Sequence, residues 1–527
     1  MATAAAMRPE RRIGWAGLGL ATLGAAGLWT SFSYALSVWK ADPDIFVAVE
    51  LWRGVGEHGL GFVRTWGYTA DNWLFSLIPL ASAAYALFGV SARTAVLTGW
   101  GFFLASAGLT AALAAKVAGP RPAAILGPIL LFANLQALGH VGFLAYPISH
   151  NVSLAWGLAA LLLAVWSLET RAYGSALAAA ALLFVSCVSD PWASAALAAP
   201  LILVSGAIAL RNRRDDLGRP ALVLCLVSAA AFWIAHKHPF GLLHFLRRGD
   251  FQPGDAQSFA VNLRLGYEAV AAMFNLAPAA GAGAAVRAAS FVAALALVAA
   301  SGARVARSLR GAGIARQLVG GVSILSILAV TVLYLAGPAN SGLYVGRFFP
   351  NLYFLGGLLA AMAAADGGRW SRAAAGAYAA LFVLAGAASA PSAWTAPPSS
   401  SDSPKAQALG AFLRSHGLSY GYGPFWGAQA LVMRTATLGA VTIRPVTFHD
   451  GRVARRRIES SRLWYEPQAE PPGRVFLAIV ADGEACLAVA TCEMVARRQF
   501  GAPVERLTQG ETVVLVWDRP LAARIAP

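Results

Sequence analysis

The sequence has few charged residues. Only 13% of its 527 residues are charged, against roughly 25% in an average globular chain. Hydrophobic residues make up 58% of the sequence. Many apolar runs reach about 18–24 residues, which is enough for a helix to cross a ~30 Å hydrocarbon core. The shortage of charge excludes an ordinary soluble enzyme and predicts a polytopic helical membrane protein.

Several motifs of soluble enzymes are missing. The chain has no GxxxxGK loop, no HExxH and no paired CxxC, which argues against soluble nucleotide enzymes and zinc proteases. Acids are scarce, with 25 Asp and Glu against 41 Lys and Arg and a net charge of +16. Many arginines lie in short segments between apolar runs. The positive-inside rule therefore explains them better than a nucleic-acid partner does, and no such partner is expected.

Cysteine is rare too. Cys187 and Cys225 lie in apolar runs and are expected to be packed thiols. Cys486 and Cys492 lie six positions apart in the C-terminal region, which we expect to face a compartment where disulfides persist. The sequence therefore predicts a disulfide between this second pair.

The apolar runs alternate with basic turns. Arg211–Arg214, Arg304–Arg316 and Arg369–Arg372 fall on one side, and the N-terminus is expected there too. The first run, about Ile13–Leu36, is longer than the core of a signal peptide and lacks a clear cleavage site, so we expect an uncleaved span. Residues 74–146 hold three apolar stretches, one of which must be partial. About 11 transmembrane helices result, with a long polar segment at residues 236–285.

The composition changes after Pro391. Residues 392–405 form a Pro/Ser-rich linker. In residues 406–527, strand-like and helix-like stretches alternate, including a helix predicted at Trp426–Arg434, and indicate a small, parallel-rich α/β domain. The predicted fold is thus an all-α polytopic membrane domain over residues 1–391 followed by this soluble domain. We expect a bacterial inner-membrane protein with a cytoplasmic N-terminus and a periplasmic C-terminal domain.

The polar stretch Lys40–Trp73 concentrates the chemistry. It follows the first span and carries acids and aromatic residues in a chain that is otherwise poor in acids. Pro43 suits the first turn of a helix, Asp42 its cap, and Asp44 a place near the positive dipole end that favours the ionised form. A carboxylate at this boundary can act as a general base or hold a divalent metal. Mg or Mn at Asp44 is the one cofactor considered.

This acidic pair, the helical loop, its aromatic-rich end and the following span resemble the GT-C superfamily of membrane glycosyltransferases. That superfamily includes the protein O-mannosyltransferases and the bacterial lipid A aminoarabinose transferases. The resemblance covers about Ile13–Ala390 and implies a sugar donor linked to a polyprenyl or dolichyl phosphate. It also implies a catalytic acid in the first outer loop, matching Asp44 first and Asp42 second. The sequence departs from the usual Asp-Glu pair, which leaves the choice between them open.

A second match is the stretch Gly342–Gly357, GLYVGRFFPNLYFLGG. Arg347 looks like the arginine of the Arg-Tyr element that many of these enzymes carry before a late span. The resemblance implies that Arg347 holds the lipid phosphate, and a guanidinium offers the forked, permanent charge that phosphate oxygens need. The alternative is an arginine that only anchors the span at the interface.

Other polar groups are candidates for substrate binding. His150 occupies roughly the place where the family carries another polar or acidic residue, although a hydrogen-bonded structural histidine fits it as well. His236 and His238 flank Lys237 and could bind phosphate, but two histidines are weak evidence for a metal site. Lys237 or Arg247 could assist Arg347 at the phosphate.

These features together predict an enzyme, a glycosyltransferase of GT-C type. It would move a sugar from a polyprenyl-phosphate donor to a glycan, lipid or protein acceptor of the cell envelope. One alternative is a transporter or flippase of lipid-linked sugars, which should show charges at mid-span and paired half-repeats. Another is a non-catalytic scaffold for envelope assembly.

Overall fold

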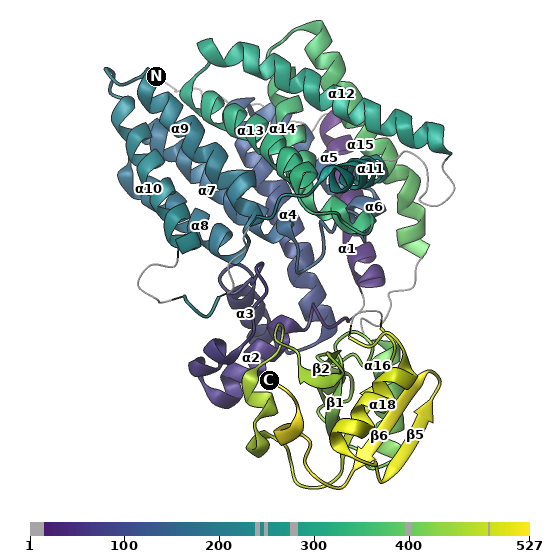
Figure 1. Ribbon diagram of the computed structural model, residues 1–527. Coiled ribbons are helices and arrows are strands. Elements are labelled where there is room, and N and C mark those ends of the chain that lie inside the picture. Colours follow the sequence, from purple (N-terminus) through teal and green to yellow (C-terminus); the bar gives the residue numbers. More distant parts are fainter. Residues whose placement is uncertain are drawn as a thin grey trace, which may run out of the picture.

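The chain forms a bundle of helices with a small mixed sheet packed at one end (Figure 1). The computed structural model describes residues 15–39, 41–237, 243–246, 251–274, 283–395, 403–482 and 485–527. We call residues 403–527 the sheet region. Figure 1 shows α1 (Trp15–Val38) running towards this region, so the acidic segment that follows α1 lies where the two parts meet.

Seven helices among the described residues are long and apolar enough to cross a membrane. They are α4 (Ala92–Val117), α7 (His150–Thr170), η2 with α9 (Ser194–Ala198, Ala199–Arg211), α10 (Gly218–Lys237), α12 with η4 (Ala284–Ser308, Leu309–Gly311), α13 (Ile314–Ala336) and α15 (Arg369–Thr395). Shorter apolar helices are α3 (Ile78–Phe88), α8 (Tyr173–Ser189) and α14 (Pro350–Ala365). The protein is a multi-pass helical membrane protein, as predicted. The total of about 11 crossings stays a prediction.

The N-terminal part of the bundle contains two short helices, α3 and α5 (Pro120–Leu131). α3 has 11 residues and spans only about 16 Å at ~1.5 Å per residue. α5 has 12 residues, contains Pro128 and ends before Phe132. Both fall in the region where one of three apolar stretches was predicted to be partial. The other short elements of the N-terminal part are α2 (Val47–His58), η1 (Leu60–Thr65) and α6 (Leu135–Leu138).

Polar contacts tie together the turns at the end of the bundle opposite the sheet region (Figure 1). They are Lys116 with Glu169 at 2.9 Å, Arg171 with Asp216 at 3.2 Å, Arg211 with the carbonyl of Arg310 at 3.0 Å, and Arg316 with Asp366. The basic turns therefore share one end of the molecule, which is the arrangement that the charge pattern predicts.

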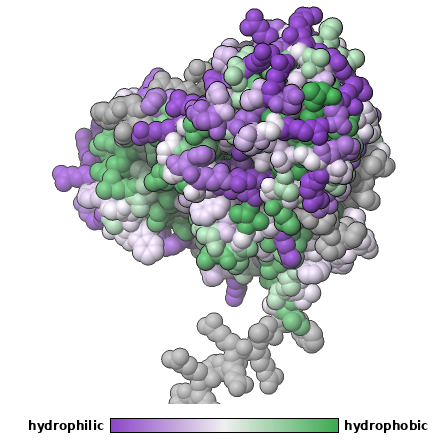
Figure 2. Space-filling model, turned by 90° about the horizontal axis from the view of Figure 1, so that it is seen from below, coloured by the Kyte–Doolittle hydropathy of each residue, from purple (hydrophilic) through white to green (hydrophobic). Residues whose placement is uncertain are grey.

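The helical bundle and the sheet region also differ in the polarity of their surfaces. Leu203, Leu226 and Leu328 on the long helices are more than half exposed, which suits helices that face lipid tails. Figure 2, seen from below, shows hydrophilic side chains over much of the face that the sheet region occupies. The bundle thus presents an apolar surface and the sheet region a polar one.

The segment 236–285, predicted to be polar without a span, contains the helix α11 (Ala256–Met273). Asp255 caps it by accepting the N–H of Ser258 at 2.8 Å. Its buried face includes Asn262, whose Nδ2 lies 3.1 Å from the carbonyl oxygens of Tyr334 and Gly337. Polar side chains elsewhere on α11 weaken the helical periodicity of its apolar residues in the sequence. α11 thereby fixes the connection after α13 that carries Arg347.

The sheet has six strands in the order β3-β2-β1-β4-β6-β5. Only its centre is parallel, because β1 pairs in parallel with β2 and β4 while the three outer pairings are antiparallel. The strands are β1 (Tyr420–Pro424), β2 (Thr442–His449), β3 (Arg452–Arg455), β4 (Val475–Ile479), β5 (Glu505–Gln509) and β6 (Thr512–Trp517). The helices of the sheet region are α16 (Pro404–Ser415), α17 (Met433–Ala436), α18 (Val489–Phe500), η6 (Arg462–Tyr465), η7 (Pro467–Ala469) and η8 (Ala522–Arg524). One further short helix, η5 (Leu343–Phe348), belongs to the bundle.

Local details of the sheet region differ from the sequence reading. The helix predicted at Trp426–Arg434 is mostly turn, because Gln429 has a left-handed φ of 53° and Gly427 packs closely against Val480. The predicted disulfide, by contrast, joins Cys486 and Cys492. α15 continues to Thr395, and residues 396–402 of the predicted linker lie outside the described residues.

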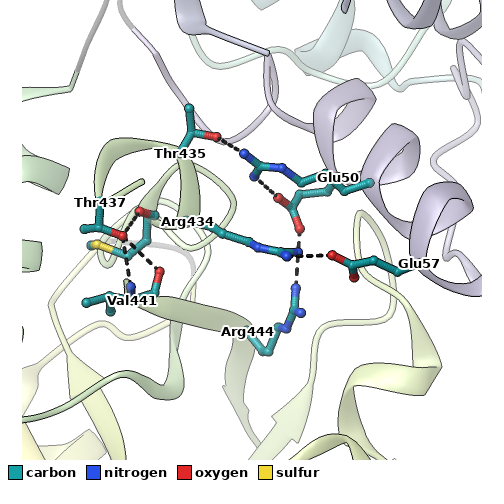
Figure 3. Close-up of polar contacts among 9 residues, drawn as sticks. Glu50, Glu57, Arg434, Thr435, Thr437, Val441 and Arg444 are labelled. Carbon is teal, nitrogen blue, oxygen red and sulfur yellow. Dashed lines mark hydrogen bonds and ion pairs between the residues drawn. The ribbon is translucent and has the colours of Figure 1, made fainter. Parts of the chain in front are cut away.

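Ion pairs fasten α2 to the sheet region (Figure 3). Glu50 is only 3% exposed and pairs with Arg53 at 2.8 Å and with Arg444 of β2 at 3.4 Å. Glu57 pairs with Arg434 at 2.5 Å. A buried carboxylate with two cationic partners resists separation, because losing either partner leaves charge poorly compensated. The sheet region is thus held at a defined place beside the acidic loop.

Candidate functional site

A cavity of about 770 Å³ lies where the helical bundle meets the sheet region. Aromatic side chains such as Trp39, Tyr344 and Trp426 form much of its wall. Its charged lining residues come from both parts of the chain: Asp42, Asp44, Asp71, Arg347, Arg456 and Glu459. Both predicted acids and the predicted phosphate-binding arginine therefore line one cavity, although more than 300 residues separate Arg347 from the two acids in the sequence.

Asp42 is held by two donors. Its Oδ1 accepts the N–H of Ile45 at 2.9 Å, and the hydroxyl of Tyr146 lies 3.1 Å from each carboxylate oxygen. α2 begins only at Val47, so Asp42 caps the turn that leads into α2. Burial raises the pKa of Asp42 to about 6. These contacts give Asp42 a mainly structural task.

Asp44 lies two residues further on, and its carboxyl lies within hydrogen-bonding reach of that of Glu459, which lines the same cavity. Burial first, and then the negative charges of Glu459 and Asp42, raise the pKa of Asp44 well above its usual range. The expectation that the helix start would favour the ionised form is wrong for the net effect, because desolvation and like charges outweigh the dipole here. Once ionised, such a carboxylate is a stronger base than an exposed one.

Arg347 lies on η5, opposite the acids. Its guanidinium lies over the rings of Tyr344 and Phe348, each 5.3 Å away, and among the described residues its buried Nε has no hydrogen-bond partner. Gly346 packs against the carbonyl of Val141 so closely that any side chain there would overlap it. Trp192 also donates to the carbonyl of Phe348 at 3.0 Å. Arg347 is therefore rigidly placed with donor capacity to spare.

Asp71 is a further acid of the cavity. Burial, and then the charge of Asp190, raise the pKa of Asp71, while His150 and Arg347 act in the opposite direction. Asp71 belongs to the same acid-bearing stretch, Lys40–Trp73, as Asp42 and Asp44. It contributes negative charge beside Arg347.

The remaining predicted residues that the structure describes do not line the cavity. His150 is buried between the rings of Trp192 and Phe348, 5.1 and 5.0 Å away, and its Nδ1 lies 2.8 Å from Asp190. It supports η5 from behind. His236 lies 3.1 Å from the hydroxyl of Ser194 at the end of α10, and Lys237 follows it. His238 and Arg247 lie outside the described residues.

Arg456, Glu459 and Trp426 are among the cavity residues that sequence reasoning missed. The sequence analysis places Trp426 only at the start of a helix, Trp426–Arg434. Glu459 lies beside a run of arginines, a pattern that is typical of a solvated surface. Nothing local marks either charged residue as part of the site, since Asp42 and Asp44, which line the same cavity, are about 400 positions away in the chain.

Three of the seven non-glycine residues with a left-handed φ among the described residues line the cavity. Among the described residues, Trp73, Phe143 and Glu459 have φ values of 56°, 54° and 53°, and all three line it. A non-glycine residue in this region costs about 1–3 kcal/mol and persists where the surroundings hold it, often at functional sites. The strain supports this cavity as the functional site.

The divalent metal considered at Asp44 stays a prediction. Among the described residues, no group of three or more His, Cys, Asp or Glu is arranged to hold a metal ion. Asp42 is engaged by Ile45 and Tyr146, and Glu459 by Arg456. We assign no metal ligand here and derive no step through a metal.

Comparisons with known proteins identify the fold. No protein-family model and no curated protein match the sequence. ArnT from Cupriavidus metallidurans in the apo state is similar in structure, with a TM-score of 0.53, 12% identity, and 97% of this chain and 100% of ArnT covered. ArnT bound to undecaprenyl phosphate gives the same score and identity over 98% and 99%. An oligosaccharyltransferase of Archaeoglobus fulgidus gives 0.48 at 14% identity, over 86% and 67%.

The chain is therefore a polytopic membrane protein with the GT-C fold, and the resemblance drawn from its sequence is confirmed at the level of the fold. One structure that it resembles over nearly its whole length, sheet region included, is ArnT.

Proposed function

We propose that this protein is a glycosyltransferase that moves a sugar from a polyprenyl-phosphate carrier to a hydroxyl group of a cell-envelope acceptor. The observation that carries the proposal is a single cavity that holds both a carboxyl base, Asp44, and a rigid guanidinium, Arg347. The fold supports it, because ArnT has been crystallised with undecaprenyl phosphate. Acceptors of three kinds fit the chemistry: a glycan, a lipid or a protein.

In the proposed reaction, Asp44 takes the proton of the acceptor hydroxyl as its oxygen bonds to the anomeric carbon of the sugar. A hydroxyl is a poor nucleophile and needs such a base. The bond from that carbon to the phosphate oxygen breaks, and its electron pair leaves with the lipid phosphate. Arg347 stabilises the charge that develops there, which is electrostatic catalysis.

A second cavity suits the lipid chain. It has a volume of about 470 Å³, lies between α11, α12, α13 and α14, and is lined almost wholly by apolar side chains. Phe349 lines it, and Phe349 follows Arg347 by two residues. A carrier with its phosphate at Arg347 could thus extend its isoprenoid chain into an apolar space.

The direct test is conversion of a labelled polyprenyl-phosphate sugar by the purified protein. A transferase releases the lipid phosphate and labels the acceptor. A flippase would move the intact lipid across a vesicle without cleaving it, and a scaffold would do neither. Either of the last two results would overturn the proposal.

We propose that residues 1–391 form the membrane domain, 392–405 a linker and 406–527 a domain on the periplasmic face of the inner membrane. The sheet region lies opposite the basic turns, and basic turns favour the cytoplasm (Figure 1). A reporter that is active only in the periplasm, fused after Pro527, is expected to be active. A silent periplasmic fusion together with an active cytoplasmic one would reverse this orientation.

Transfer is expected to fall as the pH drops through the raised pKa of Asp44. The base must be ionised, and burial with Glu459 and Asp42 holds its pKa above the ordinary value of about 3.9. The acid limb of the rate profile should therefore lie well above pH 4. Initial rates measured across the acidic and neutral range, with enzyme stability checked at each pH, test this. An acid limb near the ordinary carboxyl value would contradict it.

A further inference from the structure

Residues 456–461 of the sheet region press against the loop between α1 and α3. The N–H of Glu459 donates to the carbonyl of Gly67 at 2.7 Å, and the N–H of Gly67 donates to the carbonyl of Ser460 at 2.8 Å. A side chain on Gly67 would overlap the carbonyl of Arg457. The two segments are therefore in direct backbone contact, and this contact fixes the position of Glu459 at the cavity.

The side chain of Glu459 is directed as firmly as its backbone. Arg456 Nη2 lies 2.7 Å from its Oε2, and the guanidinium of Arg456 is 4.0 Å from the ring centre of Phe425. Glu459 is only 15% exposed, and its carboxyl lies within hydrogen-bonding reach of that of Asp44 in the wall of the same cavity. An ionised carboxylate can only accept hydrogen bonds, so a bond between two carboxyls requires one proton.

We infer that Glu459 is a positioning residue for Asp44: the sheet region supplies the second carboxyl of the site, and the two carboxyls hold one proton between them. The role of Asp44 as a base rests on the proposed function, whereas the shared proton rests on the contact alone. Two carboxyls this close do not both ionise readily, because like charges repel in a desolvated site. The pair thus carries one negative charge and can still accept a proton.

The transfer step balances with this pair. The acceptor O–H bond breaks and its proton joins the pair at Asp44. The acceptor oxygen bonds to the anomeric carbon, and the electron pair of the broken carbon–oxygen bond leaves with the lipid phosphate. The pair then holds two protons and no charge, and one proton passes to solvent before the next turnover. Glu459 needs no contact with the substrate.

Other charged groups face the pair. Asp42 and Asp71 add negative charge, Asp42 acting on Asp44 and Asp71 on Glu459, and Arg456 opposes them at both carboxyls. Glu459 has the largest effect of the charged neighbours on Asp44. Removing its charge should therefore lower the pKa of Asp44 and weaken it as a base.

Glu459→Gln tests the inference, because an amide keeps the size and can still donate to Asp44. We expect the acid limb of the pH–rate profile to move to lower pH. At neutral pH, kcat should fall about tenfold, a part of the roughly 10²–10⁴ that a general base supplies, while donor KM stays unchanged. Glu57→Gln is the matched control, because Glu57 pairs with Arg434 at the same junction but does not line the cavity. It should leave the profile unchanged.

Infrared difference spectra of the purified full-length protein supply a readout that needs no transfer activity. Wild type should show a buried protonated carboxyl at neutral pH that Glu459→Gln and Asp44→Asn each remove. Persistence of that band in either variant, or an acid limb that Glu459→Gln leaves in place while only lowering thermal stability, overturns the inference. If wild type transfers no sugar from any polyprenyl phosphate, the proposed function fails, and the infrared band still decides whether the carboxyls share a proton.

Discussion

Asp44→Asn is expected to abolish sugar transfer while expression and thermal stability stay near wild type. The amide preserves the shape of the side chain but cannot accept the proton of the acceptor hydroxyl. General-base catalysis contributes roughly 10²–10⁴ in rate, so a loss of that order is the minimum expected. The measurement is initial transfer rate with purified protein at saturating donor, together with a melting curve of each variant.

Asp42→Asn is the matched control, since Asp42 lines the same cavity two residues away. It accepts the Ile45 N–H as a cap and the hydroxyl of Tyr146. The change should cost on the order of 1 kcal/mol of stability, as weakening a cap does, and leave part of the activity. A dead Asp42→Asn beside an active Asp44→Asn would exchange the two roles. Two active variants would remove the catalytic assignment from this pair.

Arg347→Ala is expected to produce the other large loss, in both donor binding and turnover. The guanidinium is buried against Tyr344 and Phe348, and its Nε has no partner among the described residues, so a phosphate could take up its donors. Removing one such donor from developing negative charge costs roughly 10²–10³ in kcat. Donor KM should rise as well, and binding of undecaprenyl phosphate should weaken in the absence of acceptor.

Arg347→Lys should lie between wild type and Arg347→Ala. Lysine keeps the charge but loses the fork that holds two phosphate oxygens at once. Arg372→Ala is a suitable control, because Arg372 is an exposed arginine that hydrogen-bonds the carbonyl of Gly367 next to the basic end of the bundle. If both Arg347 variants kept the wild-type dependence on donor, Arg347 would serve only to anchor its span at the membrane interface.

Much of the architecture follows from local pattern in the sequence. Long apolar runs with basic turns between them predict a multi-pass helical protein, because the hydrocarbon core demands length and low charge from each span. The position of Asp42, Asp44 and Arg347 at the membrane surface could also be predicted from the sequence, because polar residues at the ends of apolar runs lie there whatever the packing. α11 was missed, because one buried face built around Asn262 gives a weaker signal than a run of apolar residues.

The tertiary structure alone decided how the site is completed. Glu459 and Arg456 lie in a run of arginines whose local pattern indicates a solvated surface, yet they line the cavity beside Asp44. Their environment depends on contacts between Gly67 and Ser460, and between Glu50 and Arg444, that join segments about 400 residues apart. The raised pKa of Asp44 has this origin in part, because Glu459, which raises it more than any other charged neighbour does, comes from across this junction. Periodicity and composition report what each segment requires of its surroundings, whereas the identity of the side chain that meets Asp44 depends on which distant segment packs against it.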